Sequence, residues 1–251
     1  IPYFHVVFTI PASIAAIALQ NKEILFQILF RTSAQTLLTI AADPKHLGAT
    51  IGLFSILHTW GQNLLFHPHV HCVVTGGGLA PDGESWIASR PHFLLSVRVL
   101  SRLFRRLFVE ALEQAYADGQ LQFHGDLEHL DNRDKFLHYL KPARRTPWVV
   151  YAKPPFAGPT HVIDYLGRYT HRVAISNHRL LALQDDHVTF QYKDYSARDP
   201  QQSRQMRLPA EEFLRRFLLH VIPPGFQRIR HYGLFSNRFR ARSLARCRAL
   251  L

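Results

Sequence analysis

Histidines alternate with apolar residues in one short segment of this chain, and that segment constrains the fold more than any other. Residues 66–75 read FHPHVHCVVT, which places His69 and His71 two positions apart before a pair of valines. A period of two is typical of a β-strand, so we predict a strand over residues 69–75. The flanking apolar residues predict that this strand is buried, and buried imidazoles need polar partners. The fold must therefore bring such partners to the strand.

Turn-forming residues follow the predicted strand. Gly76, Gly77 and Gly78 stand at its end and are interpreted as a loop rather than as a phosphate-binding motif. The Pro-Asp-Gly sequence at residues 81–83 predicts a hairpin turn that leads into a return strand near residues 85–88.

The rest of the chain alternates between helical and strand patterns. Between residue 11 and about residue 60, apolar residues recur at helical spacing with breaks near Asn21 and Asp43, which predicts two or three helices. Further helices are expected over residues 96–116, 131–140, 159–169, 209–220 and 237–251. Further strands are expected over residues 3–10, 148–152, 180–183, 187–192 and 227–232. Strands separated by helices and joined by hairpins predict an α+β fold with a central antiparallel sheet.

The charge balance points to an anionic partner. The 251 residues include 30 Lys and Arg against 18 Asp and Glu, which gives a formal net charge of +12. Nucleic acid is the first candidate for a partner and a membrane surface the second. Aromatic residues are interleaved with the arginines near residues 102–108 and 228–248, as suits single-stranded nucleic acid, although a solvated basic face is an equally good interpretation of any one cluster.

Composition also limits the compartment and the class of protein. Hydrophobic residues make up 47% of the chain, which excludes gross disorder. We expect neither a transmembrane helix nor a signal peptide. Two cysteines cannot form a disulfide framework or a four-thiolate zinc site, so a reducing, cytoplasmic location is expected.

His69 and His71 are the first candidates for chemistry. On a strand they share one face, where two imidazoles can hold one divalent metal ion with a third ligand from elsewhere in the fold. The chain has 16 histidines, so a His-x-His pair is expected about once by chance. Two structural strand histidines are therefore an equally good interpretation of the pair alone. His67 is a weaker ligand candidate, because Pro68 leaves the start of the strand uncertain.

Tyr165 and Tyr169 are the second candidates. In the predicted helix they lie one turn apart on one face, with His161 one turn earlier and Arg168 and Arg172 beside them. A phenol with a pKa near ~10 is a weak nucleophile, but a metal ion or a guanidinium at a scissile phosphate would offset this weakness. A half-buried aromatic stripe is the simpler interpretation of the tyrosine pair taken alone.

Taken together, four ordered motifs resemble a known family. They read PYFHVVFT at residues 2–9, TWGQNL followed by HPHVHCVV at 59–74, YLGRYTHRVAISN at 165–177 and RHYG at 230–233. In this order they resemble the two-tyrosine rolling-circle transposases of insertion-sequence-91 type, which belong to the HUH endonuclease superfamily.

The resemblance implies a complete mechanism. It implies that His69 and His71 hold Mg²⁺ or Mn²⁺ and that Tyr165 and Tyr169 attack single-stranded DNA at transposon ends and target, becoming linked to a 5′-phosphate. It implies an HUH endonuclease-like sheet with the nucleophile helix against the metal-binding strand. DNA contacts are expected from Arg168, Arg172 and Arg230. Residues 1–235 would form the catalytic domain and residues 236–251 a basic helical tail, in a DNA-associated bacterial protein.

Several alternatives remain open at this point. The third metal ligand could be His161, His5, Asp164 or Gln62, and neither the order of the tyrosines nor homo-oligomer formation is fixed by the sequence. Family members usually carry a cysteine-rich, zinc-binding N-terminal segment to which nothing here corresponds, so a non-catalytic DNA-binding remnant is the main alternative function. A zinc hydrolase fits less well, because such sites need three or more protein ligands.

Overall fold

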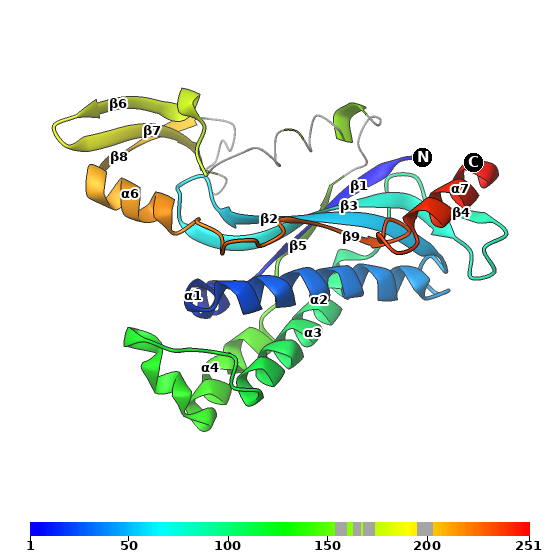
Figure 1. The fold of residues 1–251 in the computed structure, drawn as a ribbon, viewed down its shortest axis with the longest axis horizontal. Coiled ribbons are helices and arrows are strands. Elements are labelled where there is room, and N and C mark those ends of the chain that lie inside the picture. The colour runs from blue at the N-terminus through cyan, green and yellow to red at the C-terminus, as the bar shows by residue number, and fades with distance from the viewer. Residues whose placement is uncertain (154–159, 163–166, 168–173, 195–202) are drawn as a thin grey trace.

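A six-stranded sheet forms the centre of the computed structural model, which describes residues 1–153, 160–162, 167, 174–194 and 203–251 (Figure 1). The strand order is β5-β1-β3-β2-β9, and β4 pairs with β3 beside this path. Every pairing is antiparallel, which confirms the α+β prediction. The strands are β1 (Tyr3–Thr9), β2 (Thr50–Trp60), β3 (Phe66–Leu79), β4 (Trp86–Ala88), β5 (Val150–Lys153) and β9 (Ile229–Gly233).

Helices cover one face of this sheet (Figure 1). Val70, Cys72 and Val74 of β3 are fully buried on that face and pack in one apolar core with Phe26 and Leu29 of α2. By length and composition α2 could cross a membrane, but 61% of its most apolar window is buried inside the protein, as in a core helix. The helices of this layer are α1 (Ala12–Gln20), α2 (Lys22–Ala42), α3 (Val97–Ala117) and α4 (Arg133–Arg145), with a 3-10 turn over Gly125–Asp131.

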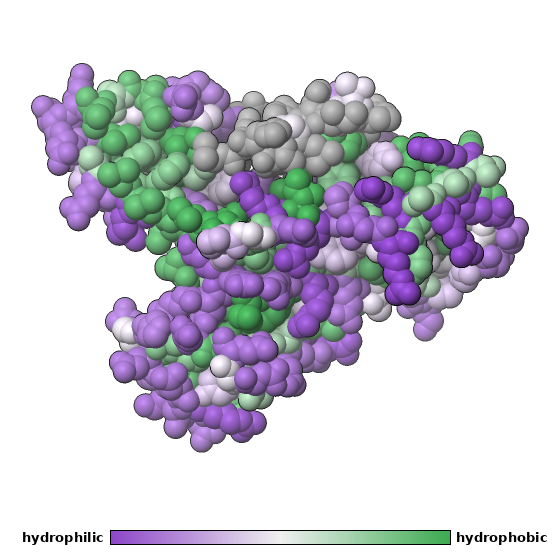
Figure 2. All heavy atoms as spheres, viewed as in Figure 1, coloured by the Kyte–Doolittle hydropathy of each residue, from purple (hydrophilic) through white to green (hydrophobic). Residues whose placement is uncertain are grey.

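A second, three-stranded sheet lies at one end of the molecule (Figure 1). It consists of β6 (Leu180–Gln184), β7 (His187–Lys193) and β8 (Ser203–Pro209), followed by α6 (Ala210–Leu218). The hairpin between β6 and β7 turns at Asp185 and Asp186, which both have positive φ. Hydrophobic side chains gather on the surface of this end (Figure 2), and Leu183 is 72% exposed.

The last helix, α7 (Arg240–Leu250), docks on the hairpin between β3 and β4. The Arg246 side chain donates to the carbonyl of Gly83 and pairs with Glu84 at 2.6 Å. Cys247 of the same helix is buried. A helix in the tail was expected from the sequence, whereas the domain boundary at residues 235 and 236 stays a prediction.

The helical prediction between residues 11 and 60 is right for α1 and α2 and wrong for the remainder. Residues 50–60 form β2, which lies between β3 and β9 in the sheet. This strand is buried on both faces over most of its length, so its sequence is a nearly continuous apolar run. Such a run does not distinguish a buried strand from a buried helix by periodicity.

The loop predicted at the three glycines is also wrong, because Gly76, Gly77 and Gly78 lie inside β3. Neighbouring backbone approaches these positions too closely for any side chain. A Cβ at Gly78 would stand 2.3 Å from the Thr50 carbonyl oxygen, and one at Gly77 would stand 2.5 Å from that of Ile87. The glycines therefore permit β2 and β4 to pair closely with the same strand.

Two smaller differences concern the end of one helix and the presence of one additional strand. The helix expected to stop before Pro142 continues as α4 to Arg145, with Pro142 inside it. Strand β8 was not expected from the sequence, because Ser203–Pro209 alternates polar and apolar residues only weakly. The predicted hairpin of β6 and β7 and the return strand β4 are confirmed.

Candidate metal centre

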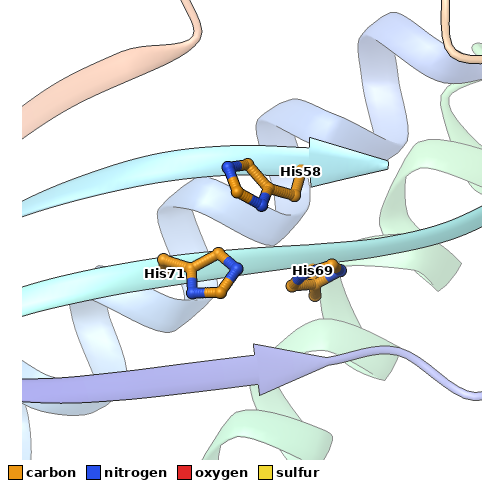
Figure 3. A group of neighbouring side chains, drawn as sticks. All are labelled: His58, His69 and His71. Atoms are coloured by element: carbon orange, nitrogen blue, oxygen red, sulfur yellow. The ribbon is translucent and has the colours of Figure 1, made fainter. Parts of the chain in front are cut away.

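Three histidines from two adjacent strands point toward one another (Figure 3). His58 lies on β2, and His69 and His71 lie on β3. One ligand nitrogen from each ring falls within 4.8 Å of the other two. His58 stands directly opposite His69 in the strand register, which brings the third imidazole to the predicted pair.

The histidine cluster lies on the face of the sheet opposite α2. Because side chains alternate along a strand, Val70 and Cys72 enter the helical core while His69, His71 and Val73 face the other way. Phe54 and Ile56 of β2 share this second face with His58. One face of the sheet thus packs on the helices, and the other carries the candidate metal ligands.

The hydrogen bond made by His69 fixes its tautomer. Its Nδ1 lies 2.7 Å from the carbonyl oxygen of His67, and a carbonyl can only accept, so Nδ1 carries the proton. The lone pair of His69 is therefore on Nε2, where it can bind a metal ion. A backbone carbonyl that orients a ligating histidine in this way is typical of metal sites.

His71 is oriented by a fourth histidine. Its Nδ1 lies 2.8 Å from Nε2 of His5 on β1, and the two rings stack with centroids 5.1 Å apart. With the Nδ1 proton donated to His5, Nε2 of His71 holds a lone pair. His5 was a candidate third ligand from the sequence. In the structure it contacts His71 and orients that ring, and it is not one of the three clustered histidines.

Burial keeps these imidazoles neutral. Burial, with smaller contributions from neighbouring cationic groups, lowers the pKa of His5 to about 4. Burial also lowers the pKa of His69 to about 4 and the pKa of His71 well below its usual value. Neutral imidazoles at pH 7 are ready metal ligands, because no proton has to be displaced.

The donor set fits a divalent transition ion. Three neutral imidazole nitrogens suit ions that accept nitrogen ligands, whereas Mg²⁺ prefers oxygen ligands in an octahedral shell. Of the two ions implied by the sequence resemblance, Mn²⁺ therefore fits these residues better. Three protein ligands also leave positions for a substrate oxygen.

Of the other candidates for the third ligand, the structure describes His161 and Gln62. The side chain of His161 is exposed, whereas Gln62 stays a candidate from the sequence. Asp164 lies outside the described residues. His58 was missed because residues 50–60 were interpreted as helical. Its segment, Ile56-Leu57-His58-Thr59-Trp60, lacks the alternation of histidine and apolar residues that marks the neighbouring strand, so no period indicated His58.

Both predicted nucleophiles, Tyr165 and Tyr169, lie outside the described residues, as do Arg168 and Arg172. The described residues just before them are informative. Residues 160–162 are helical, and Val162 is only 7% exposed. Val162 packs against Phe54, Ile56 and Val73, which lie on the face of the sheet that carries the histidines.

Arg230 lies on the opposite face. Its guanidinium stands 4.5 Å from the ring centre of Phe30 and 5.0 Å from that of Phe226, so both contacts are cation–π packing. A contact between Arg230 and DNA stays a prediction.

Comparisons with known proteins agree on one family. The model of the family Y2_Tnp, described as a putative transposase, matches residues 52–243. Putative transposase y4qJ of Sinorhizobium fredii is 62% identical over 99% of this chain and 62% of its own length. The transposase for insertion sequence element IS801 of Pseudomonas savastanoi pv. phaseolicola is 29% identical over 94% of this chain and 55% of its own length. The chain thus spans less than two thirds of these curated relatives.

Solved structures of the conjugative relaxase TrwC give weaker matches. The complex of TrwC with a 27-mer DNA has a TM-score of 0.33 at 13% identity, covering 98% of this chain and 73% of that one. The metal-bound complex with OriT DNA has a TM-score of 0.36 at 13% identity, covering 99% and 72%. Both TM-scores are low, so the fold class rests on the antiparallel sheet itself.

Proposed function

Because the chain belongs to the Y2_Tnp family of putative transposases, we propose that it cleaves single-stranded DNA through a covalent 5′-phosphotyrosine intermediate and transfers the strand. The reaction depends on a divalent metal ion. The observation that carries this proposal is the group of His58, His69 and His71, whose ligand nitrogens lie within 4.8 Å of one another.

The three histidines supply an electrophilic site. A divalent ion bound there would polarise the scissile phosphate and stabilise the charge that develops on its oxygens. His5 and the carbonyl of His67 hold the rings of His71 and His69 in the orientation that this role requires.

The tyrosines supply the nucleophile. A phenol oxygen attacks phosphorus, forms a P–O bond to the enzyme and breaks the bond from phosphorus to the 3′ oxygen. The phenol loses its proton and the departing 3′ oxygen gains one, which leaves a free 3′-OH and a 5′-phosphotyrosine. A second tyrosine allows a second cleavage, and attack by a 3′-OH on the phosphotyrosine rejoins the strands without external energy.

The position of Val162 supports the choice of Tyr165 and Tyr169. Helical residues i, i+3 and i+7 share one face, so the predicted helix puts both tyrosines on the side of Val162. Val162 packs on the sheet face that carries the histidines. Arg168 and Arg172 would then stand beside the same strand of DNA.

Covalent capture tests the proposal. The protein is incubated in Mn²⁺ with a 3′-labelled pool of random-sequence single-stranded DNA, and protein-linked label is detected on a denaturing gel. We expect an adduct with the unchanged protein, none with the double variant Tyr165→Phe and Tyr169→Phe, and an undiminished adduct with the control Tyr139→Phe. Tyr139 donates to the carbonyl of Ser13 in the helical layer, away from the histidines.

Two results would contradict the mechanism. An adduct that persists in the double Phe variant would assign the nucleophile to another residue. DNA binding and Mn²⁺ binding without any adduct in the unchanged protein would favour the alternative function, a non-catalytic DNA-binding remnant.

A further inference from the structure

A cavity of about 230 Å³ opens beside the candidate metal centre. It lies where the end of β2 meets the segment that follows α6. Its walls are mostly aromatic or aliphatic and include one cationic side chain. The lining residues used below are Trp60, Phe217, His220, Val221, Ile222 and Arg228.

Trp60 belongs both to this cavity and to the surroundings of the metal centre. Its ring stacks on His58 with centroids 4.7 Å apart and an angle of 14° between the planes. His58 and Trp60 are two positions apart along β2, a rise of about 6.7 Å in a regular strand. The register between β2 and β3 shifts between these two positions, and shifts of this kind next to active sites serve to redirect side chains. A group in the cavity would therefore be a near neighbour of a group bound by the histidines.

The chemistry of the walls suits a flat, weakly polar group. Phe217 and Ile222 are half-buried and provide apolar surface. His220 contributes its ring faces, because Nδ1 lies 3.3 Å from the Thr59 hydroxyl and Nε2 lies 3.1 Å from the carbonyl oxygen of Leu64. Both of its nitrogens are thus engaged within the protein.

Arg228 connects the cavity to a more polar one. It also lines a neighbouring cavity of about 530 Å³ together with Gln227, His231 and Asn237. Ile56, on the same sheet face as the histidines, lines that second cavity as well. An apolar pocket that adjoins a polar, cationic track matches a nucleotide, which has an aromatic base and an anionic backbone.

We propose that the cavity between Trp60 and Phe217 binds one nucleobase of the cleaved strand, from a nucleotide next to the phosphate held at the metal centre. This proposal rests on the proposed function, because it takes single-stranded DNA as the substrate. Enzymes that act on DNA commonly stack an unpaired base between aromatic and apolar side chains in a snug pocket. Base capture at this point would fix which phosphate lies at the histidines, so the pocket would be a determinant of cleavage position.

Two oligonucleotides separate base binding from backbone binding. One is a random-sequence single strand of about 20 nucleotides, and the other has the same length with abasic sites throughout. Affinities are measured by fluorescence anisotropy at one low salt concentration. We expect the unchanged protein to prefer the strand with bases. Trp60→Leu and Phe217→Leu should each reduce that preference by about 5- to 150-fold, the range for one aromatic stack, with little change in affinity for the abasic strand.

Controls keep the test specific. Trp86→Leu removes a tryptophan of β4 outside the cavity and should keep the full preference. Phe217→Leu should also keep the Mn²⁺ affinity of the unchanged protein, which excludes an indirect effect through His58. Phe217→Leu also guards against a folding defect in Trp60→Leu, since Phe217 lies on α6 and not in the central sheet.

The outcomes distinguish this proposal from the proposed function. Absence of any base preference in the unchanged protein, or full preference in Phe217→Leu, overturns the pocket even where covalent adducts form. Loss of preference in the variants combined with no adduct in the unchanged protein supports the pocket as a base-binding site and contradicts the cleavage mechanism.

Discussion

His5 and His71 show how one imidazole can direct another. The Nε2 of His5 and the Nδ1 of His71 lie 2.8 Å apart, so a single proton is shared between two nitrogens. When His71 presents its Nε2 lone pair to a metal ion, the shared proton belongs to Nδ1 of His71 and His5 accepts it. His5 is itself buried at 4% exposure, so the sheet holds this arrangement without help from solvent.

The first prediction at the residue scale concerns His58. His58→Ala should weaken Mn²⁺ binding as strongly as His69→Ala, because each removes one of three nitrogen ligands. The control is His67→Ala, which removes an exposed imidazole from the same strand and should leave the affinity unchanged. Calorimetric titration of Mn²⁺ into each variant provides the measurement. Equal Mn²⁺ affinity in His58→Ala and the unchanged protein would remove His58 from the site.

The second prediction concerns how the free energy of unfolding of the metal-free protein changes at acid pH. The folded protein holds the pKa of His5 and His69 at about 4, whereas an unfolded histidine titrates near 6.5. Between these values the unfolded chain binds more protons, so the free energy of unfolding falls as pH drops from about 6.5 toward 4. Denaturant unfolding in a chelator should show lower stability at pH 5 than at pH 7. The difference should shrink in His5→Phe, and equal stability at both pH values in the unchanged protein would be the contrary result.

At the scale of elements, the strands β2 and β3 differ in how well the sequence predicted them. The strand β3 was predictable because His69 and His71 alternate with apolar residues and so display a period of two. β2 is buried on both faces, so its sequence is mostly apolar and its few buried polar residues, Ser55, His58 and Thr59, show no period of two. The candidate pair was therefore found from the sequence and the third histidine was not. The same reasoning accounts for Gly76–Gly78, whose role depends on strands that pair with them from elsewhere in the chain.

The prediction at this scale concerns the contact between Val162 and the sheet. Val162→Asp would bury an unpaired carboxylate among Phe54, Ile56 and Val73, so the helical segment should detach. Adduct formation with single-stranded DNA should be lost, while Mn²⁺ affinity stays unchanged because the histidines lie on other elements. His161→Asp places the same charge at the exposed neighbouring position and should keep both properties. Normal adduct formation in Val162→Asp would show that this contact does not position the nucleophile.

At the scale of the whole molecule, the sheet separates two tasks. The helical layer of α1, α2, α3 and α4 covers one face and holds the larger core (Figure 1). The other face carries the histidine cluster. The family was recognisable from the sequence, because its motifs occur in a fixed order along the chain. The division between the two faces was not, because it depends on β1 and β9, which pair with the β2–β3 hairpin across long sequence distances.

The prediction for the whole molecule concerns salt. A net charge of +12 should draw single-stranded DNA through its phosphates, and each neutralised phosphate adds about −0.7 to the slope of log affinity against log salt. We therefore expect a steep negative slope in anisotropy titrations between low and physiological salt. A methylphosphonate strand of the same sequence, whose backbone is uncharged, should give a nearly flat line. A flat line with ordinary DNA would mean that the excess arginines do not contact the backbone.

The three histidines of the candidate centre all lie between positions 58 and 71, on the two arms of the single hairpin formed by β2 and β3. Antiparallel hairpins close within microseconds, well before contacts between distant parts of a chain are made. The three ligands are thus encoded locally and come together when this hairpin forms, whereas His5, which orients His71, is added when β1 pairs with β3. A metal ion present during synthesis would then find its ligands early and hold the register of the two central strands.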